Sequence, residues 1–438
     1  MKRTKRILLG LACAALLAAS WAAALTAKSG ADRQRELIDE AASYTDDEIY
    51  ILAVPLLEEA ASYQDEHTLE AETALKEVYL RLAGKDNYER RYTELLDKQM
   101  ARKGAGADIF REAALYYLDK SKTADALSAL RDGIGKTGSG ELIRLYEENR
   151  YGYTLSRDFY DKAAELHCGT SQVALNGRWG VASANGLLLI PCEYDKISTF
   201  DGGRAIVQKD GVISAVDGGD NRVALLHEAA QDFGNYAENR LSLKTAEGWL
   251  LANGTFGTGP VLFEELGMFS GGCAPARLGG KWGLIDSGGE KWLLEPAYEE
   301  IVRDELGRCG GPETLFIRRN GGVYLLADGQ ETGGPYEDAR PFNGGWAAVK
   351  QGGKWGFVDA EGVIQVDFQF DDARSFGQHL AAVEQEGLWG YVSLLGEMAI
   401  EPQFLEAKSF SGGSAPVHTG LGWQFITLLE YEGGGGLF

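Results

Sequence analysis

Histidine and cysteine, the residues that most often carry metal or nucleophilic chemistry, show no arrangement typical of an active site. The five histidines have no HExxH or other ligand spacing: His67, His167, His227, His379 and His418. The four cysteines beyond the first thirty residues form no CxxC pair and no regular ladder: Cys168, Cys192, Cys273 and Cys309. This pattern predicts neither a disulfide framework nor a zinc site, and leaves one incidental disulfide open.

Cys168 directly follows His167, but neighbours in sequence do not have the geometry of a nucleophile and its base. Cys168 also occupies the turn position that Gly202 holds in the next repeat. We therefore expect structural histidines and cysteines, with no catalytic residue, no bound metal and no cofactor.

Paired carboxylates are the other candidate, because glycoside hydrolysis needs an acid and a second carboxylate across the scissile bond. The pairs are Glu264-Glu265, Glu299-Glu300 and Asp371-Asp372. They recur at one phase of successive repeats, whereas a catalytic pair breaks the symmetry of its scaffold, so we predict turn chemistry. If these turns share one rim, the resulting acidic ring would attract a cationic ligand.

The strands and turns that would position these residues belong to a unit that is repeated along the sequence. The stretch Lys281–Asp286 recurs nearly unchanged as Lys354–Asp359. Looser or Trp-less copies surround Trp179, Ile213, Trp249, Tyr324, Trp389 and Trp423. The resulting eight copies are 31 to 42 residues apart. Such a period is typical of small supersecondary units that must stack to bury their faces.

Each unit is predicted to contain three strands. The middle strand carries the Trp, and in two copies it ends in Asp286 or Asp359, whose side chains should cap the N–H groups of a Gly-containing turn. We expect the Trp residues to form the core between neighbouring sheets rather than an exposed sugar-stacking ladder. The glycines that follow them would let another backbone approach closely: Gly180, Gly283, Gly356 and Gly390.

Over residues 151–430 this pattern resembles the bacterial WG-repeat (KWG) family. The Trp-Gly pair is intact at Trp179, Trp282, Trp355 and Trp389. It departs at Trp249-Leu250, Trp423-Gln424, Ile213 and Tyr324, so some units could present different surfaces. The resemblance implies a repeat-built β module that binds a ligand or a protein, and no common catalytic residues.

The two ends of the array predict that it closes on itself. The eighth unit stops soon after Thr427, without a third strand. The missing pieces precede the first Trp, as a possible strand Tyr151–Leu155 and the aromatic–acidic step Tyr160-Asp161. A closed ring has no exposed sheet edges. We predict an eight-bladed β-propeller-like toroid closed by an N-terminal strand, with an open twisted β-array as the alternative.

Residues 31–150 change to the helical period. Amphipathic helices are predicted over Thr68–Ala83, Asn87–Arg102, Asp108–Asp119, Thr123–Ile134 and Gly140–Asn149. One unit resembles a tetratricopeptide repeat through Ala114, Tyr117, Ala126, Leu130 and Gly133. Gly133–Thr137 ends like a phosphate-binding loop, but Leu130 replaces the first glycine and a helix precedes it, which indicates a helix end.

The first residues predict export. Lys2, Arg3, Lys5 and Arg6 precede an uncharged run, Ile7–Leu25, which suits either a cleaved signal peptide or a retained membrane anchor. The expected domains are therefore a leader (1–30), a helical domain (31–150), the WG-repeat β domain (151–430) and a flexible Gly-rich tail (431–438). The expected location is extracytoplasmic, membrane-anchored or secreted.

The formal charge of −22 argues against nucleic acid or an anionic lipid surface as partner. We expect a non-catalytic binding or scaffold protein for an unknown protein or cell-envelope partner, which touches the membrane only through its N-terminal segment. One alternative is an envelope-glycan hydrolase or lyase that uses unpaired carboxylates in the longest step of the array, Asp304, Glu305 and Glu313 beside Arg303. The other alternative is a structural spacer.

Overall fold

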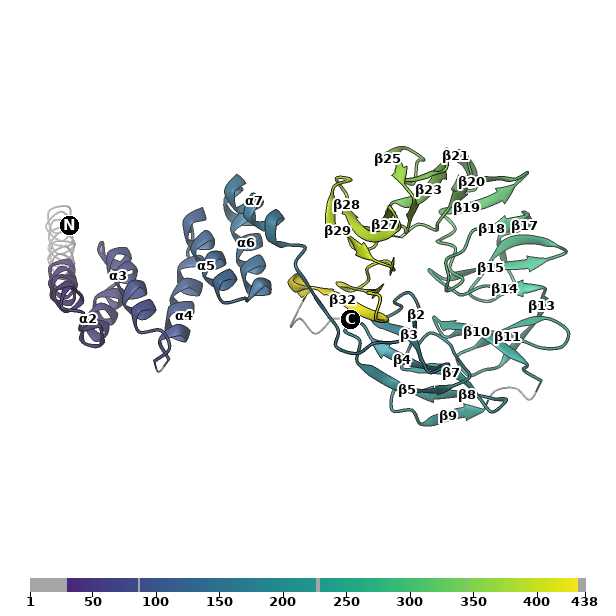
Figure 1. Ribbon diagram of the computed structural model, residues 1–438, viewed down its shortest axis with the longest axis horizontal. Helices are drawn as coiled ribbons and strands as arrows, with labels where there is room; N and C mark the ends of the chain where they lie inside the picture. Colours follow the sequence, from purple (N-terminus) through teal and green to yellow (C-terminus); the bar gives the residue numbers. More distant parts are fainter. Residues whose placement is uncertain (1–29, 86, 226–228, 344, 432–438) are drawn as a thin grey trace, which may run out of the picture. The chain divides into compact units, whose positions relative to one another are not determined.

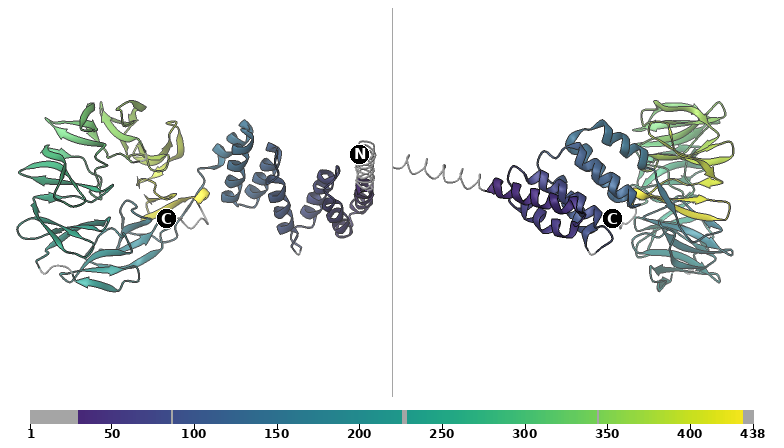
Figure 2. Two further views of the ribbon diagram at one scale, coloured as in Figure 1. Left: turned by 180° about the vertical axis from the view of Figure 1, so that it is seen from behind. Right: turned by 60° about the vertical axis from the view of Figure 1, so that its left-hand side comes forward.

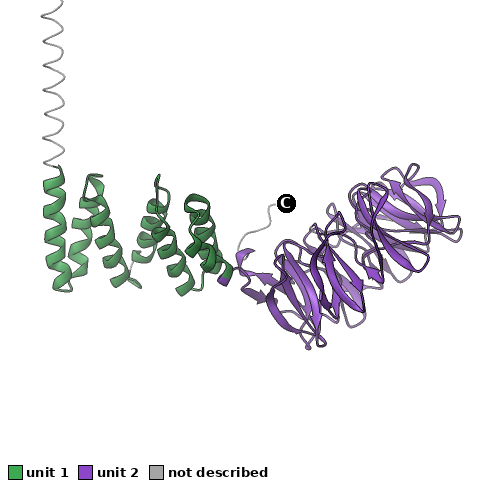
Figure 3. Ribbon diagram, turned by 90° about the horizontal axis from the view of Figure 1, so that it is seen from above, with its two compact units in different colours: residues 1–147 green, residues 148–438 purple. Residues whose placement is uncertain are grey.

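The computed structural model describes residues 30–85, 87–225, 229–343 and 345–431. The predicted leader (1–30) lies outside the described residues except for residue 30, and the predicted tail (431–438) except for residue 431. His227 is also outside them. The chain divides into two compact units, Met1–Glu147 and Glu148–Phe438 (Figure 3).

The first unit is built from consecutive helices joined by short links (Figure 1). Their bounds are 30–46, α2 (Tyr50–Ser62), α3 (Thr68–Arg81), α4 (Tyr88–Met100), α5 (Ala107–Asp119), α6 (Thr123–Thr137) and α7 (Gly140–Asn149). The last five agree with the predicted helices to within a few residues. No helix in the described part of the chain is long and apolar enough to cross a membrane.

Small side chains allow α5 and α6 to pack closely. Ala114, Ala126 and Leu130 are fully buried between them. A Cβ atom at Gly133 would lie 2.6 Å from Cβ of Phe110, so only glycine fits there. The helix then ends at Gly138, which adopts φ 62° as a left-handed C-cap. The Gly133–Thr137 segment is therefore part of a helix end, as predicted.

The second unit is an eight-bladed β-propeller, and each blade is an antiparallel four-stranded sheet (Figures 1 and 2). Blades 1 to 4 are β2 (Lys162–Ala163), β3 (Thr170–Leu175), β4 (Arg178–Ser183), β5 (Leu188–Tyr194); β6 (Lys196–Ile197), β7 (Arg204–Lys209), β8 (Val212–Asp217), β9 (Arg222–Leu225); β10 (Asp232–Ala237), β11 (Arg240–Lys244), β12 (Trp249–Asn253), β13 (Thr258–Phe263); and β14 (Glu265–Leu266), β15 (Cys273–Leu278), β16 (Lys281–Asp286), β17 (Trp292–Tyr298).

Blades 5 to 8 follow in chain order, except that the last strand of blade 8 is β1. They are β18 (Glu300–Ile301), β19 (Thr314–Arg319), β20 (Gly322–Ala327), β21 (Gln330–Tyr336); β22 (Asp338–Ala339), β23 (Ala347–Gln351), β24 (Lys354–Val358), β25 (Ile364–Phe370); β26 (Asp372–Ala373), β27 (Leu380–Gln385), β28 (Leu388–Ser393), β29 (Met398–Phe404); and β30 (Glu406–Ala407), β31 (Ser414–His418), β32 (Trp423–Leu428), β1 (Tyr153–Leu155). The strand named first in each blade lies nearest the centre of the ring and is called the inner strand below: β2, β6, β10, β14, β18, β22, β26 and β30. A short 3-10 turn, Leu429–Tyr431, follows β32.

The last blade is completed by the first strand of the unit. β1 pairs antiparallel with β32, in the register Tyr153↔Leu428 and Leu155↔Ile426. Tyr160 forms a further bridge with Trp423. This is the predicted closure by an N-terminal strand, so the closed ring is confirmed and the open array is wrong.

The repeated Trp packs between neighbouring blades, as Trp355 does with Ala373 and Phe376 of the next blade, and the glycine after it serves the packing of strands within its own blade. Trp282, Trp355, Trp389 and Trp423 are buried, whereas Trp179 and Trp249 are half-buried. A Cβ atom on the glycine after the Trp would lie only 2.4–2.7 Å from a carbonyl oxygen of the adjacent strand, as at Gly180, Gly283, Gly356 and Gly390. The side chain is therefore missing where two backbones approach most closely.

The repeated acidic residues serve the turns. Asp286 accepts a hydrogen bond from the Gly289 N–H at 3.0 Å, and Asp359 accepts one from Val363 at 2.8 Å. The first member of each carboxylate pair also caps a turn: Glu264 accepts from Gly280 at 3.0 Å, Glu299 from Asn320 at 3.3 Å, and Asp371 from Glu386 at 3.0 Å. These residues are the predicted turn chemistry.

Candidate ligand-binding site

The longest step of the array forms a loop across the ring. This central loop, residues 302–313, connects β18 to β19 in blade 5. The Leu306 carbonyl accepts a hydrogen bond from Asn235 Nδ2 of blade 3 at 2.9 Å. The Gly307 carbonyl accepts one from the Met268 N–H of blade 4 at 3.1 Å. Because its partners come from other blades around the ring, the loop lies among the inner strands.

Glu305 extends this contact to the blades opposite. Its Oε1 accepts a hydrogen bond from the Glu165 N–H of blade 1 at 2.6 Å. Its Oε2 lies 2.6 Å from Nζ of Lys408, which follows the inner strand of blade 8. Glu305 therefore joins blade 5 to the seam where the ring closes.

Two of the three predicted carboxylates, Asp304 and Glu305, are not unpaired, which corrects the sequence-based expectation. Asp304 accepts hydrogen bonds from the N–H groups of Leu306 and Arg308 at 3.0 and 2.9 Å, and Arg308 Nε lies 2.6 Å from its other oxygen. The partners of Glu305 come from distant repeats, so sequence proximity could not show them. For Glu313 the structure shows only a backbone contact, in which its carbonyl accepts from Asp328 N–H.

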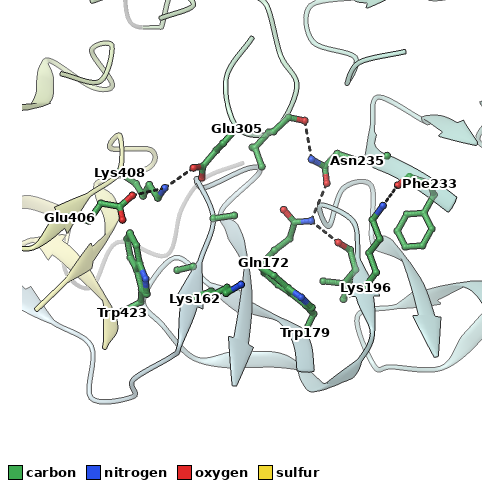
Figure 4. A pocket seen from close by; sticks show the side chains of 15 residues that line it. Lys162, Gln172, Trp179, Lys196, Phe233, Asn235, Glu305, Glu406, Lys408 and Trp423 are labelled. Carbon is green, nitrogen blue, oxygen red and sulfur yellow. Dashed lines mark hydrogen bonds and ion pairs between the residues drawn. The ribbon is translucent and has the colours of Figure 1, made fainter. Parts of the chain in front are cut away.

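A pocket of about 610 Å³ opens beside the central loop, on blades 8, 1, 2 and 3 (Figure 4). It is lined by Lys162, Ala163, Ala164, Gln172, Trp179, Lys196, Ile197, Phe233, Gly234, Asn235, Glu305, Leu306, Glu406, Lys408 and Trp423. Aromatic rings and lysines thus converge on one hollow that the central loop borders, as is typical of ligand sites.

Most polar groups of the pocket are held in place by one another. Gln172 Nε2 donates to Asn235 Oδ1 at 3.0 Å and to the Ile197 carbonyl at 2.7 Å. Lys196 Nζ donates to Asp232 at 2.5 Å and to the Phe233 carbonyl at 2.6 Å. These contacts fix the wall of the pocket before any ligand arrives, which lowers the entropic cost of binding.

Lys162 is the exception. Its side chain is exposed and forms no ion pair with any other described residue. Its Nζ lies 5.9 Å from the centre of the Trp179 ring, and Figure 4 shows it between Trp179 and Trp423. Among the charged lining residues, three lysines face two glutamates. Lys196 is paired with Asp232, and Lys408 with Glu305 and Glu406, so Lys162 is the lining lysine without a carboxylate partner among the described residues.

A single position explains why this side of the ring is hollow. In blades 6, 7 and 8 the residue directly after the inner strand is Arg340, Arg374 or Lys408, and each lies over a Trp ring, 4.8, 5.5 and 5.2 Å from its centre. The register of the inner strands places Ala164, Ser198, Gly234 and Gly267 at this position in blades 1 to 4. Long basic side chains fill one half of the ring, and small residues leave space in the other.

Blades 1 and 2 differ in charge from blades 3 to 8 at the start of the inner strand, where blades 3, 4 and 5 carry Asp232, Glu265 and Glu300. In blades 6 to 8 this residue is acidic and is paired with a neighbouring base, as in Arg340–Asp372 at 3.3 Å and Arg374–Glu406 at 3.3 Å. In blades 1 and 2 it is Lys162 or Lys196. The inner carboxylates are therefore mostly neutralised and form no free acidic ring. In the carboxylate pairs this position is the second acidic residue, and the lysines that replace it in blades 1 and 2 do not stand out in the sequence because they form no such pair.

On the other side of Glu305 lies a second hollow of about 360 Å³ with Arg308, Arg340 and Arg374 in its wall. Glu165 is only 6% exposed there, and its Oε2 accepts a hydrogen bond from the Ser409 N–H at 3.0 Å. Burial, and then the charge of Glu305, raise the pKa of Glu165 to about 7. Sequence analysis gave no signal for this residue.

His167 and Cys168 do lie close together in space, with Asp201 of blade 2 beside them. His167 Nε2 is 3.5 Å from Cys168 Sγ and 3.7 Å from Asp201 Oδ2. A nucleophile triad uses one ring nitrogen for the nucleophile and the other for the carboxylate. Here Nε2 faces both groups. Burial also raises the pKa of Cys168 and lowers the pKa of His167. Neither the geometry nor these shifts favour a thiolate–imidazolium pair.

The model of a family described as "WG containing repeat" matches residues 179–212, 260–282, 336–355, 355–389 and 389–419. No curated protein matches the sequence significantly.

Among solved structures, the ring is similar to PorZ, a surface component of the type-IX secretion system of Porphyromonas gingivalis (13% identity, TM-score 0.34, 63% of this chain and 46% of PorZ), so the chain spans less than half of that protein. It is also similar to a eukaryotic initiation factor (8%, 0.41, 62% and 86%). A third is the extracellular domain of the putative hybrid two-component system BT4673 of B. thetaiotaomicron (9%, 0.35, 58% and 44%). At these scores the likenesses say nothing about function.

Proposed function

This chain is a WG-repeat protein, and we propose that it is an exported, membrane-tethered binding and scaffold protein without catalytic activity. The observation that carries this proposal is the central pocket, in which Lys162 lies between Trp179 and Trp423 and has no ion-pair partner among the described residues. Aromatic walls with a few fixed polar groups are suited to recognition. Export and tethering rest on the basic and apolar N-terminal residues.

The chemistry of the pocket favours an anionic group attached to a flat or apolar body. A carboxylate would neutralise Lys162, while the aromatic rings would cover the neighbouring part of the ligand. Acidic side chains and chain ends of a protein have this chemistry, as do acidic sugars of the cell envelope. The partner class is therefore a protein or envelope polymer that presents a carboxylate, instead of the cationic ligand that an acidic rim would attract.

A crosslinking pull-down from intact cells tests this proposal. The full-length protein is compared with a variant that lacks residues 31–150 and with Lys162→Ala. The matched control is Lys244→Ala, because Lys244 also lies over a Trp ring, 5.8 Å from the centre of Trp249, but does not line the pocket. We expect the ring alone to retain its partner, Lys162→Ala to lose it and Lys244→Ala to keep it.

Two results would count against the proposal. A partner lost with residues 31–150 would assign recognition to the helical unit, and equal capture by both lysine variants would remove the pocket from recognition. Accessibility to a protease added outside intact cells tests export, and the protein must be degraded there.

The envelope-glycan hydrolase stays the second candidate because of one observation, the raised pKa of Glu165 beside the ion-paired Glu305. Two carboxyl groups whose pKa values differ are the requirement for acid catalysis of glycoside cleavage. Turnover of peptidoglycan or an envelope polysaccharide that is lost in both Glu165→Gln and Glu305→Gln would support it. Turnover that survives both substitutions would discard these residues, and the absence of any turnover by the unaltered protein on these substrates leaves the binding proposal in place.

A further inference from the structure

The turns between the first two strands of the blades contain an unexplained cysteine. These turns have two residues with positive φ, a conformation that favours glycine. Blades 2, 4 and 8 use glycine pairs, as at Gly202-Gly203, where φ is 53° and 79°. Blade 1 instead places Cys168 at the first position with φ 47°. A side chain at this position carries a conformational cost on the order of 1 kcal/mol, so it needs a compensating contact.

Two other blades show what such a contact looks like. In blade 3, Glu238 has φ 52° and its carboxylate accepts hydrogen bonds from Gly271 and Gly272 of the next blade at 2.7 and 3.0 Å. In blade 7, Gln378 has φ 51° and accepts one from the Gly413 N–H of the next blade. Cys168 has only a sulfur-to-oxygen contact of 3.7 Å with Asp201 Oδ1. A thiol is a weak donor, so this contact is a poor substitute.

The three side chains at this place have the composition and spacing of a metal site. The separations are 3.5 Å from His167 Nε2 to Cys168 Sγ, 3.7 Å from Cys168 Sγ to Asp201 Oδ1, and 3.7 Å from His167 Nε2 to Asp201 Oδ2. Tetrahedral bonds of the usual length place N, S and O ligands of zinc about 3.4–3.6 Å apart. The two Asp201 distances are to different oxygens, and one ligand atom from each residue lies within 4.8 Å of the others, so a rotation of the carboxylate is needed to bring all three to one ion.

We propose that His167 Nε2, Cys168 Sγ and Asp201 bind a zinc ion that bridges blades 1 and 2, with the fourth position open to water. A nitrogen, a sulfur and a carboxylate oxygen together are ligands that zinc accepts. Binding replaces the thiol proton of Cys168 by the metal and releases that proton to solvent.

The surroundings support the ligands and leave them accessible. Asp201 Oδ2 accepts a hydrogen bond from the Glu238 N–H at 2.7 Å, which orients the carboxylate as outer-shell donors do in metal sites. The side chains of His167 and Asp201 are 15% and 20% exposed, and Cys168 is exposed. The nearest competing cation, Arg308, is held by Asp304 at 2.6 Å. A metal ion can therefore enter from solvent without rearrangement of the backbone.

Cobalt, which occupies zinc sites and reports its ligands by absorption, provides the first measurement. The full-length protein, freed of metal with a chelator, is titrated with Co²⁺ and then with Zn²⁺. We expect one equivalent of Co²⁺ to produce a thiolate-to-cobalt charge-transfer band and the intense visible bands of a tetrahedral site, which Zn²⁺ abolishes. The melting temperature should also rise with Zn²⁺, because the ion binds the folded chain.

Cys168→Gly is the decisive variant, since glycine is the residue that the turn of the neighbouring blade already uses. It should melt slightly above the metal-free protein, because glycine removes the conformational cost at φ 47°, and it should show no charge-transfer band and gain no stability from zinc. Cys192→Ala, which removes a half-buried thiol elsewhere in blade 1, is the matched control and should behave like the unaltered protein. Asp201→Asn should weaken zinc affinity by at least the roughly 10–100-fold that loss of an outer-shell partner costs.

Three results would overturn the proposal. One is a charge-transfer band that persists in Cys168→Gly, another is a band lost in Cys192→Ala, and the third is a zinc-dependent rise in melting temperature that is equal in the Cys168→Gly and unaltered proteins. Absence of the band in the unaltered protein at excess Co²⁺ would also exclude the site.

Discussion

Blades 6 to 8 and blades 1 to 3 are built on the same repeat but treat the centre of the ring differently. In blades 6 to 8 the residue after the inner strand is a long base that covers a Trp ring and pairs with a carboxylate, as Arg374 does with Trp389 and Glu406. In blades 1 to 3 this residue is small, as at Ala164, and the Trp of blade 1 stays half-exposed. A long base at this position narrows the centre over its own Trp, and a small residue there leaves room for the pocket.

This difference separates the residues that stabilise the ring from those available for binding. A base that lies over an aromatic ring and pairs with an acid has its charge neutralised within the protein, so it offers less to an anionic ligand than a base without an ion-pair partner. Lys162 also lies over a ring, 5.9 Å from the centre of Trp179, but it has no carboxylate partner among the described residues, so its charge remains available, and Trp179 is only half-buried. Substitutions in the closed half should therefore change stability, and substitutions in the open half should change binding.

The largest difference is expected for the repeated Trp. Trp355→Ala removes a side chain that is only 3% exposed and should lower the free energy of unfolding by about 3–5 kcal/mol. Trp179→Ala should cost clearly less, because the ring of Trp179 is half-exposed. Urea unfolding of the two variants measures both values. Equal losses would mean that the open half of the ring is packed as tightly as the closed half.

A smaller effect is expected at the glycine after the Trp. The Cβ atom of Gly390→Ala would lie 2.4 Å from the Ile400 carbonyl oxygen, so the two strands must separate. Overpacking of this kind costs about 1–3 kcal/mol. The control is Gly135→Ala in α6, where no atom lies within 4 Å of the added Cβ. Thermal unfolding should show a destabilised ring for Gly390→Ala and no loss for the control.

The basic residues that follow the inner strands should contribute less to stability than the repeated Trp and the glycine after it. Arg374→Ala removes the contact with Trp389 and the ion pair with Glu406, and the side chain is 20% exposed. We expect a loss of about 1–2 kcal/mol, of which cation–π contact accounts for roughly 0.5–1 kcal/mol. Lys162→Ala, its counterpart in the open half, should change stability by less than about 0.5 kcal/mol. A larger loss for Lys162→Ala would show that Lys162 is structural.

The smallest effect on stability should accompany a large effect on binding. Ala164→Arg gives blade 1 the base that blades 6 to 8 carry and places it in the pocket, over Trp179. We expect little change in the melting temperature and loss of the partner captured through Lys162. Val212→Arg adds the same charge to blade 2 at an exposed position that does not line the pocket, and serves as the control for added charge. Retained capture by Ala164→Arg would contradict the pocket as the site.

The fold could be predicted because its determinants are local and repeated. A Trp-Gly strand, an Asp-Gly turn and an aromatic–acidic step recur with one period, and the incomplete last unit together with Tyr151–Leu155 predicted the closure that β1 and β32 form. The helices of the first unit were predicted for the same reason, because the spacing of buried residues such as Ala114 and Leu130 follows a helical face.

The centre of the ring could not be predicted in the same way. Glu305 and Lys408 are joined in space although they belong to blades on different sides of the ring, and no local pattern connects them. Other neighbours in space are one repeat apart in the sequence, as His167 and Asp201 are. The length of the repeat sets their sequence spacing, which matches no ligand motif. Alignment of the residue after each inner strand would have shown the change from Arg340 and Arg374 to Ala164 and Gly234.

The pairing of β1 with β32 also determines when, during synthesis of the chain, the ring can close. The helical unit and β1 leave the ribosome first, but the partner of β1 is β32, at the other end of the ring sequence. Until Ile426 has been synthesised, β1 has no strand to pair with, and its N–H and C=O groups must be satisfied by water or by another chain. The eighth blade can therefore be completed only after β32 has been synthesised. A product truncated before β32 keeps one open sheet edge and an unpaired β1, which exposes it to proteolysis or to strand exchange with a second truncated copy.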